Sequence, residues 1–189
     1  MFIPTTKVNT TNATSKQQDD VIADEEPLEI RLGYIDNERG RVHKSIAITM
    51  RSPGMDVELT LGFLFSENVI QSISQIMDID TSKENLIRIE LSEKISFDMK
   101  RLERHFYTTS SCGVCAKSLP LLNHGLIVSG RASFELMQKA LMAQCPMLVA
   151  VGAPSSLAVE LAQEFNITLV GFLGDEGFNI YHDDERIII

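Results

Sequence analysis

The residues best suited to chemistry are two cysteines, Cys112 and Cys115, which form a C-x-x-C pair in the polar stretch Tyr107–Lys117. Apolar residues resume at Leu119, so we expect the pair to lie on a loop that leads into a short helix. The unpaired N–H groups and the positive dipole end of a helix N-terminus stabilise a cysteine thiolate. Thiolate, rather than thiol, attacks disulfides and sulfur donors or binds metal.

Taken alone, the C-x-x-C pair is compatible with a redox pair, half of a zinc site, a sulfur carrier or a coincidence. His105 and His124 flank the cysteines, but their spacing matches no zinc finger, so we expect no metal site. Cys145 lies in an apolar context and is predicted to be a buried core residue. Within the pair, Cys112 comes first and follows polar residues, so we expect it to be the more exposed thiol, with Cys115 more enclosed.

The overall composition indicates a globular protein with no general affinity for nucleic acid or membranes. The chain of 189 residues is 44% hydrophobic and 23% charged, with a formal net charge of −9. This negative charge disfavours nucleic acid and anionic lipid, and no apolar run is long enough to span a bilayer. Three cysteines do not make a secreted disulfide framework, and the N-terminus lacks a signal-peptide pattern. We therefore expect a cytoplasmic protein.

The composition along the chain predicts a disordered tail over residues 1–22 and a single domain over 23–189. The tail has too few apolar residues to offset the entropy cost of ordering. In the domain we expect an N-terminal β-rich part over 25–106, the cysteine loop over 107–118, and a C-terminal βαβαβ part over 124–189. The alternation of strands and helices predicts an α/β fold, with a mixed, mostly parallel sheet and helices on both faces.

Hydrophobic periodicity assigns the elements within this domain. Alternation with period two and short apolar runs indicate strands, whereas apolar residues spaced three and four apart indicate helices. Strands are predicted near residues 28–32, 42–50, 75–80, 86–91, 125–129, 147–151, 167–173 and 178–181, and helices near 56–65, 132–144 and 156–165.

A set of short motifs appears in a specific order along the chain. They are Glu26–Ile30, Met50–Gly54, Leu59–Glu67, Ser111–Cys115, Ser129–Glu135, Gly152–Ser156 and Thr168–Phe172. With these motifs, the chain from about Glu25 onwards resembles the formate dehydrogenase accessory sulfurtransferase (FdhD) family. The resemblance implies an α/β core similar to that of the cytidine deaminases, and a cytoplasmic protein that is active as a homodimer.

The resemblance also implies a function. Members of the family receive sulfur from a cysteine desulfurase as a persulfide on the C-x-x-C loop, here Cys112 and Cys115. They pass it to the molybdenum or tungsten cofactor, bis-molybdopterin guanine dinucleotide, which is bound as a substrate and then activates formate dehydrogenase. We expect Cys112 to carry the persulfide. The alternatives are a shortened binding relative with impaired catalysis, and a dithiol or zinc-binding protein.

The chain departs from the family pattern in its middle. The family carries a further stretch of several tens of residues between the cysteine loop and Ser129, which is missing here. Its loss is expected to remove sheet and helix from the core and part of the cofactor pocket. Because apolar sheet surface left uncovered in this way usually marks an interface, we again expect a homodimer.

The chain also departs from the family in the turn that the resemblance assigns to the guanine dinucleotide. This turn consists of Phe172, Leu173, Gly174, Asp175, Glu176 and Gly177. It has no arginine, and Asp175 and Glu176 repel phosphate, so we expect weak nucleotide binding that arginines at its two glycines would strengthen. Arg51 and Arg131 lie at strand-to-helix turns and are further candidates for phosphate binding, with a paired or solvated role as the alternative.

Overall fold

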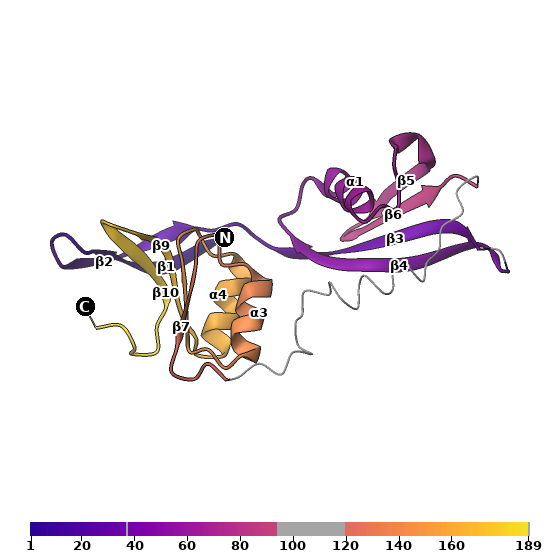
Figure 1. Ribbon diagram of the computed structural model, residues 1–189. Coiled ribbons are helices and arrows are strands. Elements are labelled where there is room, and N and C mark those ends of the chain that lie inside the picture. Colours follow the sequence, from indigo (N-terminus) through magenta and orange to yellow (C-terminus); the bar gives the residue numbers. More distant parts are fainter. Residues whose placement is uncertain (37, 94–119, 189) are drawn as a thin grey trace. The chain divides into compact units, whose positions relative to one another are not determined.

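The computed structural model describes residues 1–36, 38–93 and 120–188. The chain forms two compact units: the first combines residues 1–25 with 120–188, and the second begins at Glu26. The sequence predicts one domain over 23–189, whereas the structure has two units, because the N-terminal residues join the sheet of the C-terminal part (Figure 1).

The first unit contains a six-stranded sheet with the strand order β2-β1-β10-β9-β8-β7. Its strands are β1 (Phe2–Asn9), β2 (Thr14–Val21), β7 (Gly125–Val128), β8 (Met147–Ala150), β9 (Thr168–Gly174) and β10 (Gly177–His182). β7, β8 and β9 are parallel neighbours, whereas the other pairs are antiparallel. The sheet is therefore mixed, as predicted, and its parallel part consists of the strands expected in the βαβαβ region.

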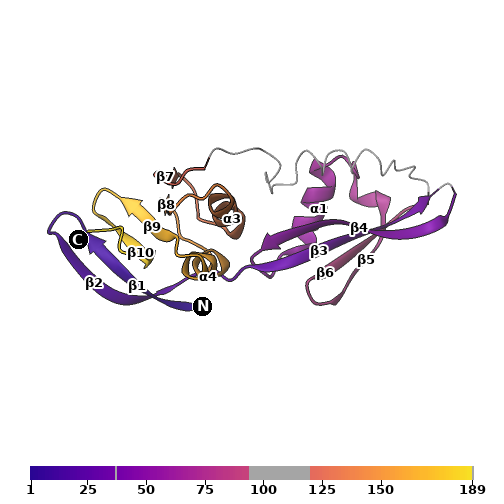
Figure 2. The same ribbon diagram turned by 90° about the horizontal axis from the view of Figure 1, so that it is seen from below.

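Both helices of this unit pack on one face of the sheet. α3 (Phe134–Met142) connects β7 to β8, and α4 (Ser156–Glu164) connects β8 to β9. Because these strands lie side by side in chain order, right-handed crossovers bring α3 and α4 to the same side (Figures 1 and 2). Met137 of α3 and Val159 of α4 share one core with Leu169 of β9. Over the part of this unit that the structure describes, the helices therefore lie on one face of the sheet, whereas helices on both faces are expected from the sequence.

The opposite face of the same sheet carries an apolar row. Ile127, Val149, Val170 and Ile180 are register partners across β7, β8, β9 and β10, so their side chains share a face. Val170 and Ile180 are buried with Ile187 packed against them, whereas Ile127 is 68% exposed. Among the described residues of this unit, no helix covers this face.

The expected disordered tail over residues 1–22 is wrong. β1 and β2 form a hairpin, and β1 pairs with β10 (Figure 2). Ile3 and Ile22 are buried in the core under the helices. The hydroxyl of Tyr181 donates a 2.5 Å hydrogen bond to Asp20 on β2, and burial together with this bond raises the pKa of Tyr181. The hairpin is ordered although it has few apolar residues, because β10 provides a partner strand that pairs with β1.

The second unit is β-rich, in agreement with the pattern predicted within residues 25–106. Its elements are β3 (Glu26–Asp36), β4 (Gly40–Arg51), α1 (Asp56–Ser66), the short 3₁₀ helix η1 (Ile73–Gln75), β5 (Ile76–Lys83) and β6 (Leu86–Leu91). The sheet order is β4-β3-β6-β5. Leu64 of α1 is fully buried in one core with Ile30 of β3 and Ile89 of β6.

Candidate functional site

The loops that follow β7 and β8 meet residues of β9 at the edge where the parallel strands of the first unit end. Backbone hydrogen bonds join these three segments. The Gly152 N–H donates to the Gly130 carbonyl at 2.9 Å, and the Ser155 N–H donates to the Ala132 carbonyl at 3.0 Å. The Phe172 N–H donates to the Gly152 carbonyl at 3.2 Å. The carboxyl edge of a parallel sheet is where ligands bind in α/β folds, so this edge is the candidate site.

Arg131 and Phe172 flank Gly152 at this edge. No hydrogen bond or ion pair joins Arg131 to any other described residue. Phe172 is 47% exposed and has a φ of 52°, a strained conformation for a bulky residue and one that occurs preferentially at functional sites. A cation with no partner among the described residues and an exposed aromatic ring suit an anionic ligand that carries a flat ring system.

Gly152 is a site residue that the sequence alone does not reveal. A Cβ atom at this position would lie 2.8 Å from Cγ and 3.1 Å from Cα of Arg131, so only glycine lets the two loops approach this closely. The signal in the sequence is a glycine directly after a buried strand, where the chain turns into a helix.

The turn from Gly174 to Gly177 lies against the N-terminal hairpin. Thr10 donates a hydrogen bond from its hydroxyl to the Asp175 carbonyl at 2.9 Å and one from its N–H to the Glu176 carbonyl at 3.1 Å. A side chain at Gly177 would overlap the carbonyl oxygen of Val8. The expected strengthening by arginine at both glycines is therefore ruled out at Gly177. The side chains of Asp175 and Glu176 are exposed, and Leu173 is half-buried.

Arg51 lies in the second unit, where its guanidinium is bound by residues of that unit. Its guanidinium donates to both carboxylate oxygens of Asp56, at 2.7 and 2.9 Å, to Asn85 at 2.8 Å and to the Glu26 carbonyl at 3.4 Å. Its side chain is only 8% exposed. These bonds raise the pKa of Arg51 and use most of its N–H groups, so phosphate binding by Arg51 is not supported.

The predicted catalytic residues, Cys112 and Cys115, and the loop over 107–118 lie outside the described residues. Cys145 is buried, as expected, and its thiol donates to the carbonyls of His124 and Met147 at 3.2 and 3.3 Å. Over the ranges that the structure describes, no three histidine, cysteine or acidic side chains are grouped as metal ligands. Within the same ranges, no helix has the length and apolar character needed to cross a membrane.

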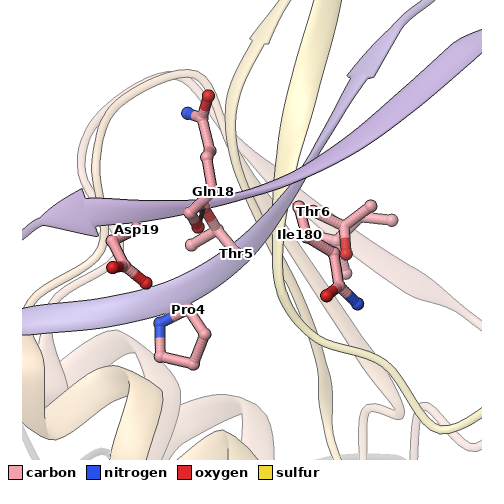
Figure 3. Close-up of a pocket in the computed structure, with 7 residues that line it drawn as sticks. Pro4, Thr5, Thr6, Gln18, Asp19 and Ile180 are labelled. Carbon is pink, nitrogen blue, oxygen red and sulfur yellow. Dashed lines mark hydrogen bonds between the residues drawn. The ribbon is translucent and has the colours of Figure 1, made fainter.

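A separate hollow of about 380 Å³ lies over the N-terminal hairpin and β10 (Figure 3). It is lined by Pro4, Thr5, Thr6, Gln17, Gln18, Asp19 and Ile180. The Thr5 hydroxyl donates to the Gln18 carbonyl at 3.0 Å and is therefore already satisfied. Asp19 is the one charged residue in this lining, so the hollow does not suit an anionic cofactor.

Comparison with known proteins finds one family. The model of the FdhD/NarQ family matches residues 23–124 and 114–188. A protein called sulfur carrier protein FdhD from Sulfurisphaera tokodaii is 27% identical over 94% of this chain and 95% of that protein. A protein of the same name from Streptomyces avermitilis is 32% identical over 94% of this chain and 92% of that protein. A solved structure from Desulfotalea psychrophila, assigned as a formate dehydrogenase accessory protein, is 17% identical with a TM-score of 0.37, covering 100% of this chain and 99% of that one.

The alignment with the Sulfurisphaera protein also contains gaps in this chain. It spans 253 positions, which exceeds the 189 residues of the chain by 64, so relatives carry residues that this chain lacks. The two matches to the family model overlap at residues 114–124. That the missing residues lie before β7 stays a prediction.

Proposed function

Because the chain belongs to the FdhD/NarQ family, we propose that it is a cytoplasmic sulfur carrier that serves the maturation of formate dehydrogenase. The observation that carries this proposal is the similarity to proteins named as sulfur carriers over 94% of the chain. Cys112 and Cys115 form the one C-x-x-C pair in the sequence and are the residues proposed to carry the sulfur.

The proposed reaction starts from a persulfide on a cysteine desulfurase. The Cys112 thiolate attacks its terminal sulfur, the donor's S–S bond breaks, and the donor cysteine leaves as thiolate while a new S–S bond forms on Cys112. Attack by the Cys115 thiolate on the inner sulfur then releases sulfide and leaves a Cys112–Cys115 disulfide. Oxidation of the two cysteines to this disulfide supplies the two electrons that reduce the transferred sulfur to sulfide. The acceptor substrate is the molybdenum or tungsten of bis-molybdopterin guanine dinucleotide, and a cellular thiol reduces the disulfide.

The carboxyl edge of β7, β8 and β9 is the proposed binding site for the guanine dinucleotide part of this substrate. The guanidinium of Arg131, which has no partner within the described ranges, would bind phosphate oxygens, and the exposed ring of Phe172 would stack on the base. Because the backbone segments approach closely at Gly152, we expect Arg131 and Phe172 to be held on one rigid backbone. Asp175 and Glu176 add no positive charge, so we expect the affinity to depend strongly on Arg131.

The missing stretch favours one alternative function. A chain that lacks at least 64 aligned positions of its relatives would still dock on the desulfurase or on formate dehydrogenase but would not complete the transfer. A dithiol or zinc-binding role for Cys112 and Cys115 is the second alternative, and metal analysis of the purified protein tests it.

Complementation tests the proposed function against the binding alternative. The chain is expressed in a strain that lacks its full-length accessory protein, and formate dehydrogenase activity is measured. Restored activity, lost again in the double variant Cys112→Ser/Cys115→Ser, is expected for a sulfur carrier. Stable expression without any restored activity would favour the binding alternative.

Arg131→Ala is expected to weaken the binding of guanosine diphosphate about ten- to hundredfold, because a charged hydrogen bond to phosphate is lost. Isothermal titration calorimetry on the unmodified chain and the variant measures the change. The affinity of the unmodified chain should also fall with added salt, whereas that of Arg131→Ala should fall less. Lys139→Ala, which removes an exposed charge from the last turn of α3, is the matched control and should bind normally.

The apolar row that includes Ile127 is expected to form a homodimer interface with a second copy of the chain. Relatives carry residues that this chain lacks, and we expect them to lie before β7, at the edge of the same sheet. Light scattering at micromolar concentration should show a dimer, and Ile127→Lys should shift it to a monomer. Met142→Lys, at an exposed apolar position on α3, should remain dimeric. A stable monomer of the unmodified chain would contradict this expectation.

A further inference from the structure

Glu25 lies directly before the second unit begins and contacts both helices of the first unit. One carboxylate oxygen accepts a hydrogen bond from the Phe134 N–H at 3.1 Å and another from the Ser155 hydroxyl at 2.6 Å. The Glu25 N–H donates in turn to the Ser156 hydroxyl at 3.2 Å. One side chain therefore joins the first residue of α3 to the N-cap residue of α4.

The hydrogen bonds of Glu25 lie at the N-termini of α3 and α4. The first N–H groups of a helix have no acceptor within the helix, and the N-terminal end favours a negative charge. Ser133 and Ser155 each cap their own helix through their hydroxyl groups. Glu25 adds an acceptor that is shared between the two helices, so it fixes one N-terminus relative to the other.

We propose that Glu25 is a positioning residue for the nucleotide-binding edge and acts through Arg131. Arg131 stands three residues before Phe134, on the short loop between β7 and the first turn of α3. Because Glu25 joins Phe134 to Ser155, the Arg131 loop keeps its place beside the loop after β8, with the backbone and Cγ of Arg131 next to Gly152. The guanidinium is thereby held at the same edge of the sheet. This inference rests on the proposed function, because it assumes that Arg131 binds the phosphates of the substrate.

The variants Glu25→Ala, Glu25→Asp and Glu25→Gln separate this role from a role in folding alone. The amide oxygen of glutamine can accept the same two hydrogen bonds, so Glu25→Gln should bind guanosine diphosphate within about threefold of the unmodified chain. Glu25→Ala removes both bonds, and Glu25→Asp is too short to keep them, so each should bind about tenfold more weakly. Glu26→Ala is the matched control, because its carboxylate faces Arg51 at 3.7 Å, and it should bind normally.

A double-mutant cycle with Arg131→Ala tests whether Glu25 acts through Arg131. Calorimetry is carried out at a temperature where circular dichroism shows each variant folded; if Glu25→Ala fails to fold, Glu25→Asp takes its place. The loss caused by the Glu25 substitution should disappear when Arg131 is already alanine. Additive losses, or unchanged binding in Glu25→Ala and Glu25→Asp, would overturn the inference while leaving the nucleotide site intact. Absence of binding by the unmodified chain would instead refute the nucleotide site itself, and the role of Glu25 with it.

Discussion

Cys112→Ser is expected to abolish the transfer of sulfur to this chain from a cysteine desulfurase. A serine hydroxyl does not ionise near neutral pH and does not attack a persulfide, whereas a cysteine thiolate does. Cys115→Ser should still accept sulfur, because the first attack needs only Cys112. It should then accumulate the persulfide, since the thiolate that releases sulfide is missing.

Intact-mass measurement after incubation with desulfurase and cysteine distinguishes these variants. One added sulfur that a reductant removes should accumulate in Cys115→Ser and be present at a lower level in the unmodified chain, where Cys115 releases it as sulfide, but should be absent from Cys112→Ser. Cys145→Ser is the control, because Cys145 is buried and its thiol is bonded to two carbonyls, so it should be labelled as the unmodified chain is. Label in Cys112→Ser and none in Cys115→Ser would reverse the assignment, and no label in the unmodified chain and in both single variants would refute the sulfur-carrier proposal.

The parallel part of the fold could be predicted because its signals are local. The apolar runs at 125–129 and 147–151 are too short for helices and end at glycines, and β7 and β8 are found there. The serines that begin the following helices, Ser133 and Ser155, accept hydrogen bonds as N-caps do. Local pattern therefore placed Arg131 correctly on a turn between strand and helix.

The N-terminal hairpin could not be predicted because its stability comes from distant residues. β2 has no buried side chain, and its sequence TSKQQDDV is typical of a solvated segment. What orders it is pairing with β1, which in turn pairs with β10, together with the bonds from Tyr181 and Asn179 to Asp20. Composition alone cannot show a partner strand that lies about 160 residues further along the chain.

The two candidate arginines could not be distinguished from the sequence either. Arg51 and Arg131 both follow a strand and precede a helix, so sequence pattern treats them alike. They differ because Asp56 and Asn85 surround Arg51, and the contact with Asn85 depends on the pairing of β3 with β6. The role of Glu25 could not be predicted for a similar reason, since the two residues that its carboxylate contacts lie more than 100 residues away in the sequence.

Arg51→Ala is expected to destabilise the second unit by about 3 kcal/mol, because it leaves the Asp56 carboxylate and the Asn85 side chain without their buried partner. Chemical denaturation followed by circular dichroism measures the change as a lower midpoint for this unit. Arg31→Ala is the matched control, since Arg31 lies on the same sheet, is 44% exposed and, within the described residues, forms its ion pair with Glu29. It should change the midpoint little, as exposed ion pairs do. Equal midpoints for Arg51→Ala and the unmodified chain would show that the buried pair contributes no stability.

The same pair predicts how this stability depends on pH. The hydrogen bonds from Arg51, with its charge, lower the pKa of Asp56 in the folded protein below its ordinary value of about 4. A lowered folded-state pKa means that the unfolded chain takes up the proton first, so the stabilisation is complete above about pH 4 and is lost as the pH falls through the folded-state pKa. The difference in unfolding free energy between the unmodified chain and Arg51→Ala should therefore be constant from pH 5 to 8 and shrink in acid. A difference that stays the same down to about pH 2 would mean that packing of the arginine stem, rather than its charge, holds α1 to the sheet.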